Sequence, residues 1–142
     1  MPDLTSVRTF LAPRKTLFGL GAVDKVAEEA KQLSDGRALI VTDETVEMLK
    51  IAEKVRGPLE GGGFEVDTWS KVEPEPTMPV ANSLAEAVRA KDYELVVGVG
   101  GGSSMDMAKV AALLKTNPGE LEGYRARVWP WPRPWRTRAW RR

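Results

Sequence analysis

The sequence predicts an α/β domain in which helices cover both faces of a parallel sheet. Three strand-like runs alternate with helix-patterned stretches between residues 23 and 115, and two of those runs are almost continuously apolar. A strand covered on one face alternates apolar and polar residues, whereas a strand buried on both faces is apolar throughout. Strands that alternate with helices favour parallel pairing through right-handed crossovers.

The first part of the chain is expected to supply a hairpin, a helix and the first buried strand. Two extended pieces around Pro13 predict an edge hairpin over residues 8–19. A helix then ends near Gly36. Its apolar face comprises Val23, Val26, Ala27, Ala30 and Leu33. The branched apolar run at 38–41 predicts a strand covered on both faces.

The middle of the chain predicts a second helix and a second strand. The helix is expected to end near Gly57 and Pro58, because proline disrupts helix interiors. Its inward face comprises Val46, Leu49, Ala52 and Val55. The alternating residues 64–69 predict a strand. Three prolines between residues 74 and 79 then indicate a loop.

The last predicted units are a helix, a strand and a helix. Leu84, Ala87 and Val88 place one face of the first of these helices. The third strand covers residues 94–100 and ends in glycines, and the final helix follows over residues 103–115.

Composition excludes several classes of site. The 142 residues contain neither cysteine nor histidine, so disulfides, thiolate metal sites and imidazole chemistry are absent. No apolar run is long enough to span a bilayer, and the N-terminus lacks a signal-peptide pattern. We therefore expect a cytoplasmic protein without a membrane partner.

The glycine-rich junction after the third strand is the candidate binding site. Gly100, Gly101 and Gly102 lie where a strand meets a helix, which is where open α/β sheets bind ligands. Ser103 is expected to cap the helix, with Asp106 three residues later in a capping-box arrangement. Free amides at this helix end would favour a pyrophosphate. The same residues also suit a tight turn that binds no ligand.

Two standard phosphate-binding signatures do not match this junction. The P-loop requires Gly-Lys-Ser/Thr at the helix start, whereas Lys109 comes six residues after Ser103. The pattern G-x-G-x-x-G matches Gly98 and Gly100 but meets Ser103 at its last position. Lys109 could also be a simple helical ion-pair partner of Asp106.

Asp43 follows the first buried strand, at the same edge of the predicted sheet. A carboxylate in that place can accept hydrogen bonds from a ribose, and it repels a 2′-phosphate. Alternatively, Asp43 caps the next helix through its side chain. The sequence leaves both interpretations open.

These residues together resemble the iron-type (metal-dependent, group III) alcohol dehydrogenase family. The stretch "GVGGGSSMDMAK" is similar to that family's Gly-Gly-Gly-Ser-x-x-Asp-x-Ala-Lys signature. The similarity runs from about residue 7 to residue 124. Supporting stretches are "FGLGA", "LIVTDET", "VEPEPT" and "TNPGELEGY".

The resemblance implies a two-domain enzyme that moves a hydride between NAD(P) and a small alcohol or aldehyde. Its N-terminal, Rossmann-like domain holds the dinucleotide. The implied cofactor-binding residues are Thr42, Asp43, Thr77, Gly100, Gly101, Gly102, Ser103 and Asp106. The glycines and Ser103 would hold the pyrophosphate, and Asp106 would lie towards the nicotinamide. Thr42 and Asp43 would face the adenosine ribose, which suggests NAD rather than NADP, and Thr77 would line the cleft.

The catalytic half of that family is missing from the sequence. The resemblance implies an iron or zinc ion held by one aspartate and three histidines in a helical C-terminal domain, yet the chain has no histidine. We therefore expect no catalytic or metal-binding residue here, and a truncated chain that is inactive alone. Oligomerisation is possible. Related glycerol-type or sugar-phosphate dehydrogenases are an alternative source for the same domain.

Residues 124–142 differ sharply from the dinucleotide-binding part, residues 1–123. The tail carries seven of the 21 basic residues, all arginine, and none of the 20 acidic ones. We hypothesise that it is an out-of-frame translation, and we expect it to be disordered. The alternative is an arm that binds nucleic acid or a membrane, because arginine and tryptophan can contact phosphates and bases or lie in a bilayer interface. We expect neither partner, since the tail lacks amphipathic spacing and its prolines prevent a helix.

Overall fold

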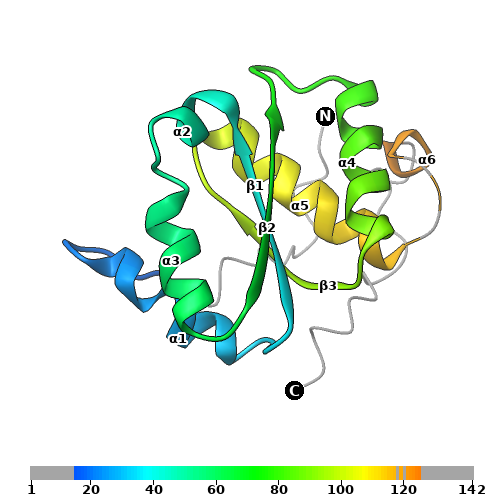
Figure 1. The fold of residues 1–142 in the computed structure, drawn as a ribbon. Helices are drawn as coiled ribbons and strands as arrows, with labels where there is room; N and C mark the ends of the chain where they lie inside the picture. Colours follow the sequence, from blue (N-terminus) through cyan, green and yellow to red (C-terminus); the bar gives the residue numbers. More distant parts are fainter. Residues whose placement is uncertain (1–14, 118, 120, 126–142) are drawn as a thin grey trace, which may run out of the picture.

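The computed structural model describes residues 15–117, 119 and 121–125. These residues form a three-stranded parallel sheet in the order β2–β1–β3, between two helical layers (Figure 1). The strands are β1 (Arg37–Asp43), β2 (Glu65–Val72) and β3 (Tyr93–Gly98). The predicted Rossmann-like α/β class is therefore confirmed.

The helices divide between the two faces of the sheet (Figure 1). On one side lie η1 (Ala22–Lys25), α1 (Val26–Lys31), α2 (Glu44–Met48) and α3 (Glu53–Gly61). On the other side lie α4 (Met78–Ala90) and α5 (Gly102–Thr116), and the short α6 (Glu122–Arg125) follows. No helix in the described part of the chain combines the length and apolar content needed to cross a membrane.

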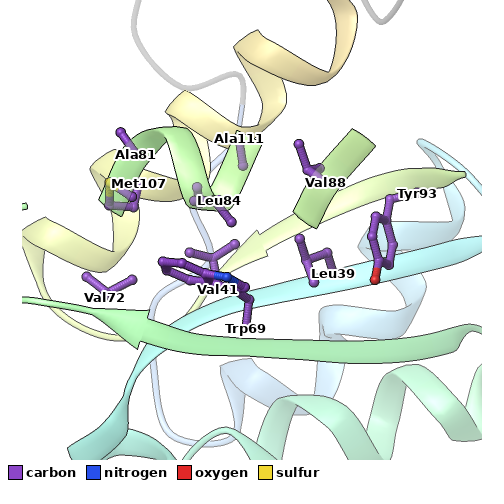
Figure 2. Close-up of a cluster of buried hydrophobic side chains, with 11 residues drawn as sticks. Leu39, Val41, Trp69, Val72, Ala81, Leu84, Val88, Tyr93, Met107 and Ala111 are labelled. Atoms are coloured by element: carbon purple, nitrogen blue, oxygen red, sulfur yellow. The ribbon is translucent and has the colours of Figure 1, made fainter. Parts of the chain in front are cut away.

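Strand β1 contributes side chains to two separate cores. Ala38 and Ile40 pack with α1 and α3, whereas Leu39 and Val41 pack with α4 and α5. Figure 2 shows the second core, where Trp69 of β2 lies beside these β1 side chains. A strand that alternates between two dry faces must be apolar at every position, which explains why its run was recognisable in the sequence.

The expected second helix is two helices. Helix α2 ends at Met48, and Lys50, just beyond its C-cap Leu49, adopts a left-handed conformation with φ 55°. The N–H of Ile51 donates to the carbonyl of Val46 at 3.0 Å, the six-to-one bond of a Schellman turn. Helix α3 then continues past Pro58, where the prediction ended it. The fully buried Leu59 anchors the helix beyond the proline, and this burial offsets the missing hydrogen bond.

The expected first helix is shorter than predicted. It begins as a 3₁₀ turn and ends at Lys31, so Leu33 lies beyond it and is 71% exposed. Ala30 is its one fully buried residue. The predicted hairpin falls mainly on residues 1–14, outside the described residues, and residues 15–18 form no strand. Most of the predicted tail likewise lies outside the described residues.

The amino edge of the sheet, where the three strands begin, is a network of paired charged and polar side chains. It comprises Arg37, Glu65, Asp67, Lys91 and Tyr93. Arg37 donates from Nε to Glu65 at 2.7 Å, while one oxygen of Asp67 accepts from Lys91 at 2.9 Å and from Tyr93 at 2.8 Å. Hydrogen bonds from Lys91 and then Tyr93 lower the pKa of Asp67. Burial and the neighbouring Asp67 raise the pKa of Tyr93 to about 12.

Candidate functional site

The carboxyl ends of β1 and β3 meet at one edge of the sheet because these neighbouring strands are parallel. Their pairing continues beyond β3, since the N–H of Val99 donates to the carbonyl of Val41 at 3.0 Å. Figure 1 shows α2, the start of α5 and the β2–α4 connection at this same end. We call this region the carboxyl edge; all eight of the predicted cofactor-binding residues belong to it or to α5 and the β2–α4 connection beside it.

Thr42 lies inside the carboxyl edge. Its side chain is fully buried, and its hydroxyl donates to the carbonyl of Val99 at 2.7 Å. The resemblance implied that Thr42 faces a ribose. In the structure its hydroxyl instead joins β1 to the turn after β3 through this hydrogen bond. Thr42 therefore fixes the position of that turn.

Asp43 is half-buried and caps α2. Its Oδ1 accepts the N–H of Val46 at 2.9 Å, so the capping interpretation holds. Its Oδ2 accepts from the hydroxyl of Ser104 at 3.4 Å. A carboxylate can accept about four hydrogen bonds in all, so capacity remains for a further donor. The carboxylate thus joins α2 to the first turn of α5.

Two glycines at this edge are required by packing. Gly100 has φ +137°, and a Cβ there would lie 2.6 Å from Oγ of Ser104 and 3.2 Å from Oδ2 of Asp43. A Cβ on Gly98 would lie 2.9 Å from Cβ of Ala108, so this glycine lets α5 pack closely on β3. Both positions therefore exclude larger side chains for structural reasons.

The next two glycines face open space. A Cβ on Gly101 or Gly102 would meet nothing within 4 Å. Gly101 is the N-cap of α5, and the helix begins at Gly102. Its first hydrogen bond runs from the N–H of Met105 to the carbonyl of Gly101 at 3.1 Å. Amides ahead of Met105 thus lack an acceptor within the helix, as at every helix start.

The predicted capping box is wrong. Ser103 is the second residue of α5, and the helix has no side-chain cap. Asp106 is exposed and forms an ion pair with Lys109 at 2.8 Å, which is the alternative that the spacing left open. Because Gly101 is extended and serves as the N-cap, the helix begins two residues earlier than it would with Ser103 as the cap.

Thr77 lies in the β2–α4 connection. It is exposed and serves as the N-cap of α4, where its carbonyl accepts the N–H of Ala81 at 3.0 Å. Strand β2 ends at Val72, which pairs with Asp43. The loop that carries Thr77 therefore leaves the sheet at the carboxyl edge.

Ser104 was not recognised from the sequence. It is 1% exposed and its hydroxyl contacts Asp43. A signal was available, because Ser104 precedes Met107, Ala108 and Ala111 at the spacing of one helical face. A serine at a core-facing position needs a polar partner.

The residues present do not fit the metal site that the resemblance implies. The described part of the chain has no group of three or more histidine, cysteine, aspartate or glutamate residues arranged to hold a metal ion. Histidine and cysteine are missing from the whole sequence. Iron and zinc sites in proteins rely largely on these two residue types.

Comparisons with known proteins identify the family that the chain resembles. The sequence model of the family described as iron-containing alcohol dehydrogenase matches residues 13–136. The chain is 33% identical over 119 residues to long-chain-alcohol dehydrogenase 1 of Geobacillus thermodenitrificans, covering 84% of this chain and 30% of that protein. It is 30% identical over 115 residues to the NAD-dependent methanol dehydrogenase of Bacillus methanolicus, covering 81% of this chain and 30% of that protein.

A solved structure gives the same result. The crystal structure of a 1,3-propanediol oxidoreductase superposes with a TM-score of 0.78 at 29% identity, covering 84% of this chain and 31% of that one. The chain thus spans about 30% of the length of the relatives it matches. The family match extends past Tyr124, where we expected the resemblance to end. By sequence and by fold, the chain belongs to the iron-containing alcohol dehydrogenase family.

Proposed function

We propose that this chain is the dinucleotide-binding part of an iron-containing alcohol dehydrogenase and binds NAD in preference to NADP at the carboxyl edge. The open space at Gly101 and Gly102, beside the free amides of a 15-residue helix, carries the proposal. Gly100, by contrast, is packed against its neighbours. The junction is therefore closed on its inner side and open where a ligand would approach.

The pyrophosphate would bind at the start of α5. Backbone amides of Gly102 and Ser103 would donate to its oxygens, and the positive end of the helix dipole favours its charge. Gly101 contributes by having no side chain in the way. As the family resemblance implies, Asp106 would lie towards the nicotinamide and Thr77 would line the cofactor cleft.

Asp43 would bind the adenosine ribose. Its carboxylate keeps unused acceptor capacity after capping α2, so it can accept from ribose hydroxyls. A 2′-phosphate in the same place would be repelled, which favours NAD over NADP. Thr42 would support this arrangement from inside, by fixing the turn through Val99.

The chemistry of a bound dinucleotide is to accept or donate a hydride at its nicotinamide ring. In full-length members of the family we expect the substrate to be a small alcohol or aldehyde. This chain lacks the histidines that the family resemblance requires for its metal. We therefore propose that the 142-residue chain binds NAD without oxidising an alcohol.

Isothermal titration of the purified chain with NAD and with NADP tests the proposal. We expect NAD to bind more tightly than NADP. Gly102→Val should weaken NAD binding at least tenfold, because its side chain would occupy the space left for the pyrophosphate. An equal affinity in wild type and Gly102→Val, or no NAD binding by the wild-type chain, would contradict it.

Gly61→Val is the matched control. Gly61 also lies in a helix, and a Cβ there also meets nothing within 4 Å, but it belongs to α3 on the other layer. Both variants add the same side chain to a helical glycine with open surroundings. Gly61→Val should keep the NAD affinity of the wild type.

A further inference from the structure

Ser104 occupies an unusual position for a polar residue. It lies in the first turn of α5 among core residues and is 1% exposed, so solvent does not satisfy its hydroxyl. That hydroxyl donates to Oδ2 of Asp43 at 3.4 Å, across 61 residues of sequence. A buried hydroxyl with a single side-chain acceptor has a preferred direction, and here that direction is towards the carboxylate.

The Asp43 carboxylate is consequently held at both oxygens. Oδ1 accepts from the N–H of Val46 at 2.9 Å, and Oδ2 accepts from Ser104. The first contact comes from the helix after β1 and the second from the helix after β3. Together the short contact to Val46 and the longer contact to Ser104 restrain the plane of the carboxylate relative to the start of α5.

Close packing around Gly100 reinforces this arrangement. A Cβ on Gly100 would lie 2.6 Å from Oγ of Ser104 and 3.2 Å from Oδ2 of Asp43, so these three groups surround one small space. A glycine hydrogen fills that space and leaves the hydroxyl facing the carboxylate. The Gly100 backbone therefore packs directly against the Ser104 hydroxyl and the Asp43 carboxylate.

We propose that Ser104 is a positioning residue that orients Asp43 and thereby sharpens the preference for NAD over NADP. This inference rests on the proposed function, because it concerns how the same site selects its ligand. Ser104 is buried and does not itself touch the dinucleotide. Its effect is to hold the carboxylate in advance where a ribose can donate to it, which lowers the ordering cost of binding.

The effect of Ser104 on the orientation of Asp43 can be separated from its contribution to core packing. The turn after β3 is held independently by the bond from Thr42 to Val99, at 2.7 Å. Removing the Ser104 hydroxyl therefore leaves the backbone of the junction fixed and removes only the contact at Oδ2 of the carboxylate. If Ser104 had a purely structural role, its removal would lower the stability and weaken the binding of NAD and NADP equally. If Ser104 orients Asp43, its removal changes the ratio of the two affinities.

The test is a double-mutant cycle measured by titration of the 142-residue chain with NAD and NADP. Ser104→Ala should lower the ratio of NAD to NADP affinity about fivefold, the effect of one net hydrogen bond. In an Asp43→Asn background, which keeps a capping acceptor for Val46, the same change should alter the ratio by less than about twofold. Circular dichroism checks that each variant folds.

Further variants separate the possible failures. Thr116→Ala removes a hydroxyl from the far end of α5 and should leave the ratio unchanged. Ser104→Cys keeps the size of the side chain and weakens its donor, so it should shift the ratio in the same direction if alanine unfolds the chain. NAD binding with an unchanged ratio in both Ser104 variants would overturn the role of Ser104 alone. Absence of NAD binding by the wild-type chain would overturn the proposed function as well.

Discussion

The two ends of the sheet use polar groups in opposite ways. At the amino edge, charged and polar side chains pair with one another, as Asp67 does with Lys91 and Tyr93. At the carboxyl edge, side chains hold backbone in place, as Thr42 does with Val99. The amides between Gly101 and Met105 have no acceptor within α5, and a Cβ on Gly101 or Gly102 would meet nothing within 4 Å. The amino edge satisfies its groups internally, and the carboxyl edge keeps donors available.

This difference separates stability from binding within one small sheet. Substitutions at the amino edge should change the free energy of unfolding and leave ligand affinity unaltered. At the carboxyl edge, the two effects should depend on whether a position faces inward or outward. The following predictions test that separation, from the largest expected change to the smallest.

The largest effect is expected for Gly100→Ala at the carboxyl edge. The backbone there has φ +137°, and the new Cβ would press on Ser104 and Asp43. We expect the free energy of unfolding to fall by about 3 kcal/mol, from backbone strain and overpacking combined. Urea denaturation followed by circular dichroism measures it.

Gly36→Ala is the counterpart at the amino edge. Its Cβ would meet the carboxylate of Glu94, which is exposed and can move aside, and its φ is not left-handed. The cost should stay below about 1 kcal/mol, as for a surface change. Equal losses for Gly36→Ala and Gly100→Ala would show that the two edges tolerate side chains alike.

The next effect is a loss of stability at alkaline pH. The pKa of Tyr93 rises from 10.0 to about 12 in the folded chain, chiefly through burial and the hydrogen bond to Asp67. The unfolded chain therefore releases this proton first, so the contribution is complete below pH 10 and disappears as pH rises through 12. The wild type should lose on the order of 1–2 kcal/mol more than Tyr93→Phe between pH 9 and pH 11. Parallel pH profiles for the two proteins would refute this assignment.

A smaller effect is expected for Asp67→Ala. Removing this carboxylate leaves Lys91 and Tyr93 without their shared acceptor, at a cost of about 1 kcal/mol near neutral pH. The pKa of Asp67 is lowered in the folded state, so its contribution is present above its ordinary pKa and is lost as pH falls. The difference between the two proteins should shrink in acid.

Asp106→Ala provides the comparison for Asp67 at the other edge. Its ion pair with Lys109 is about three-quarters exposed, so its stability should change by no more than about 0.5 kcal/mol. Thermal unfolding of both variants at pH 7 gives the comparison. A larger loss for Asp106→Ala than for Asp67→Ala would reverse the proposed division between the edges.

The strands and the long helices could be predicted because burial on two faces leaves a simple apolar pattern. The division between α2 and α3 could not, since it depends on a left-handed conformation at Lys50. Lysine gives no sign of that conformation in the sequence, whereas glycine would have done. The predicted end of this helix at Pro58 was wrong for a different reason. Burial of Leu59 stabilises the helix beyond the proline, and this tertiary contact cannot be seen in the local sequence.

The candidate site was predictable as a location but not in its contacts. The glycine run and Asp43 predicted the location of the carboxyl edge correctly. The N-cap of α5, however, is Gly101 and not Ser103. Consecutive glycines allow a helix to start at several positions, so the choice depends on tertiary packing. Asp43 could be a cap or a ligand-binding group by sequence, and the structure shows the capping contact. Its contact with Ser104 joins residues too distant in the sequence for any local pattern.

The alternation of β1 between two cores has a consequence for how the molecule comes apart. Ile40 and Leu39 are adjacent in the chain but belong to different layers. Neither layer can melt while this shared strand stays in place, and its loss exposes the inner surfaces of both. We expect denaturation to proceed in one all-or-none step. Helical content and the fluorescence of Trp69, measured in a variant whose four other tryptophans are replaced by phenylalanine, should change together.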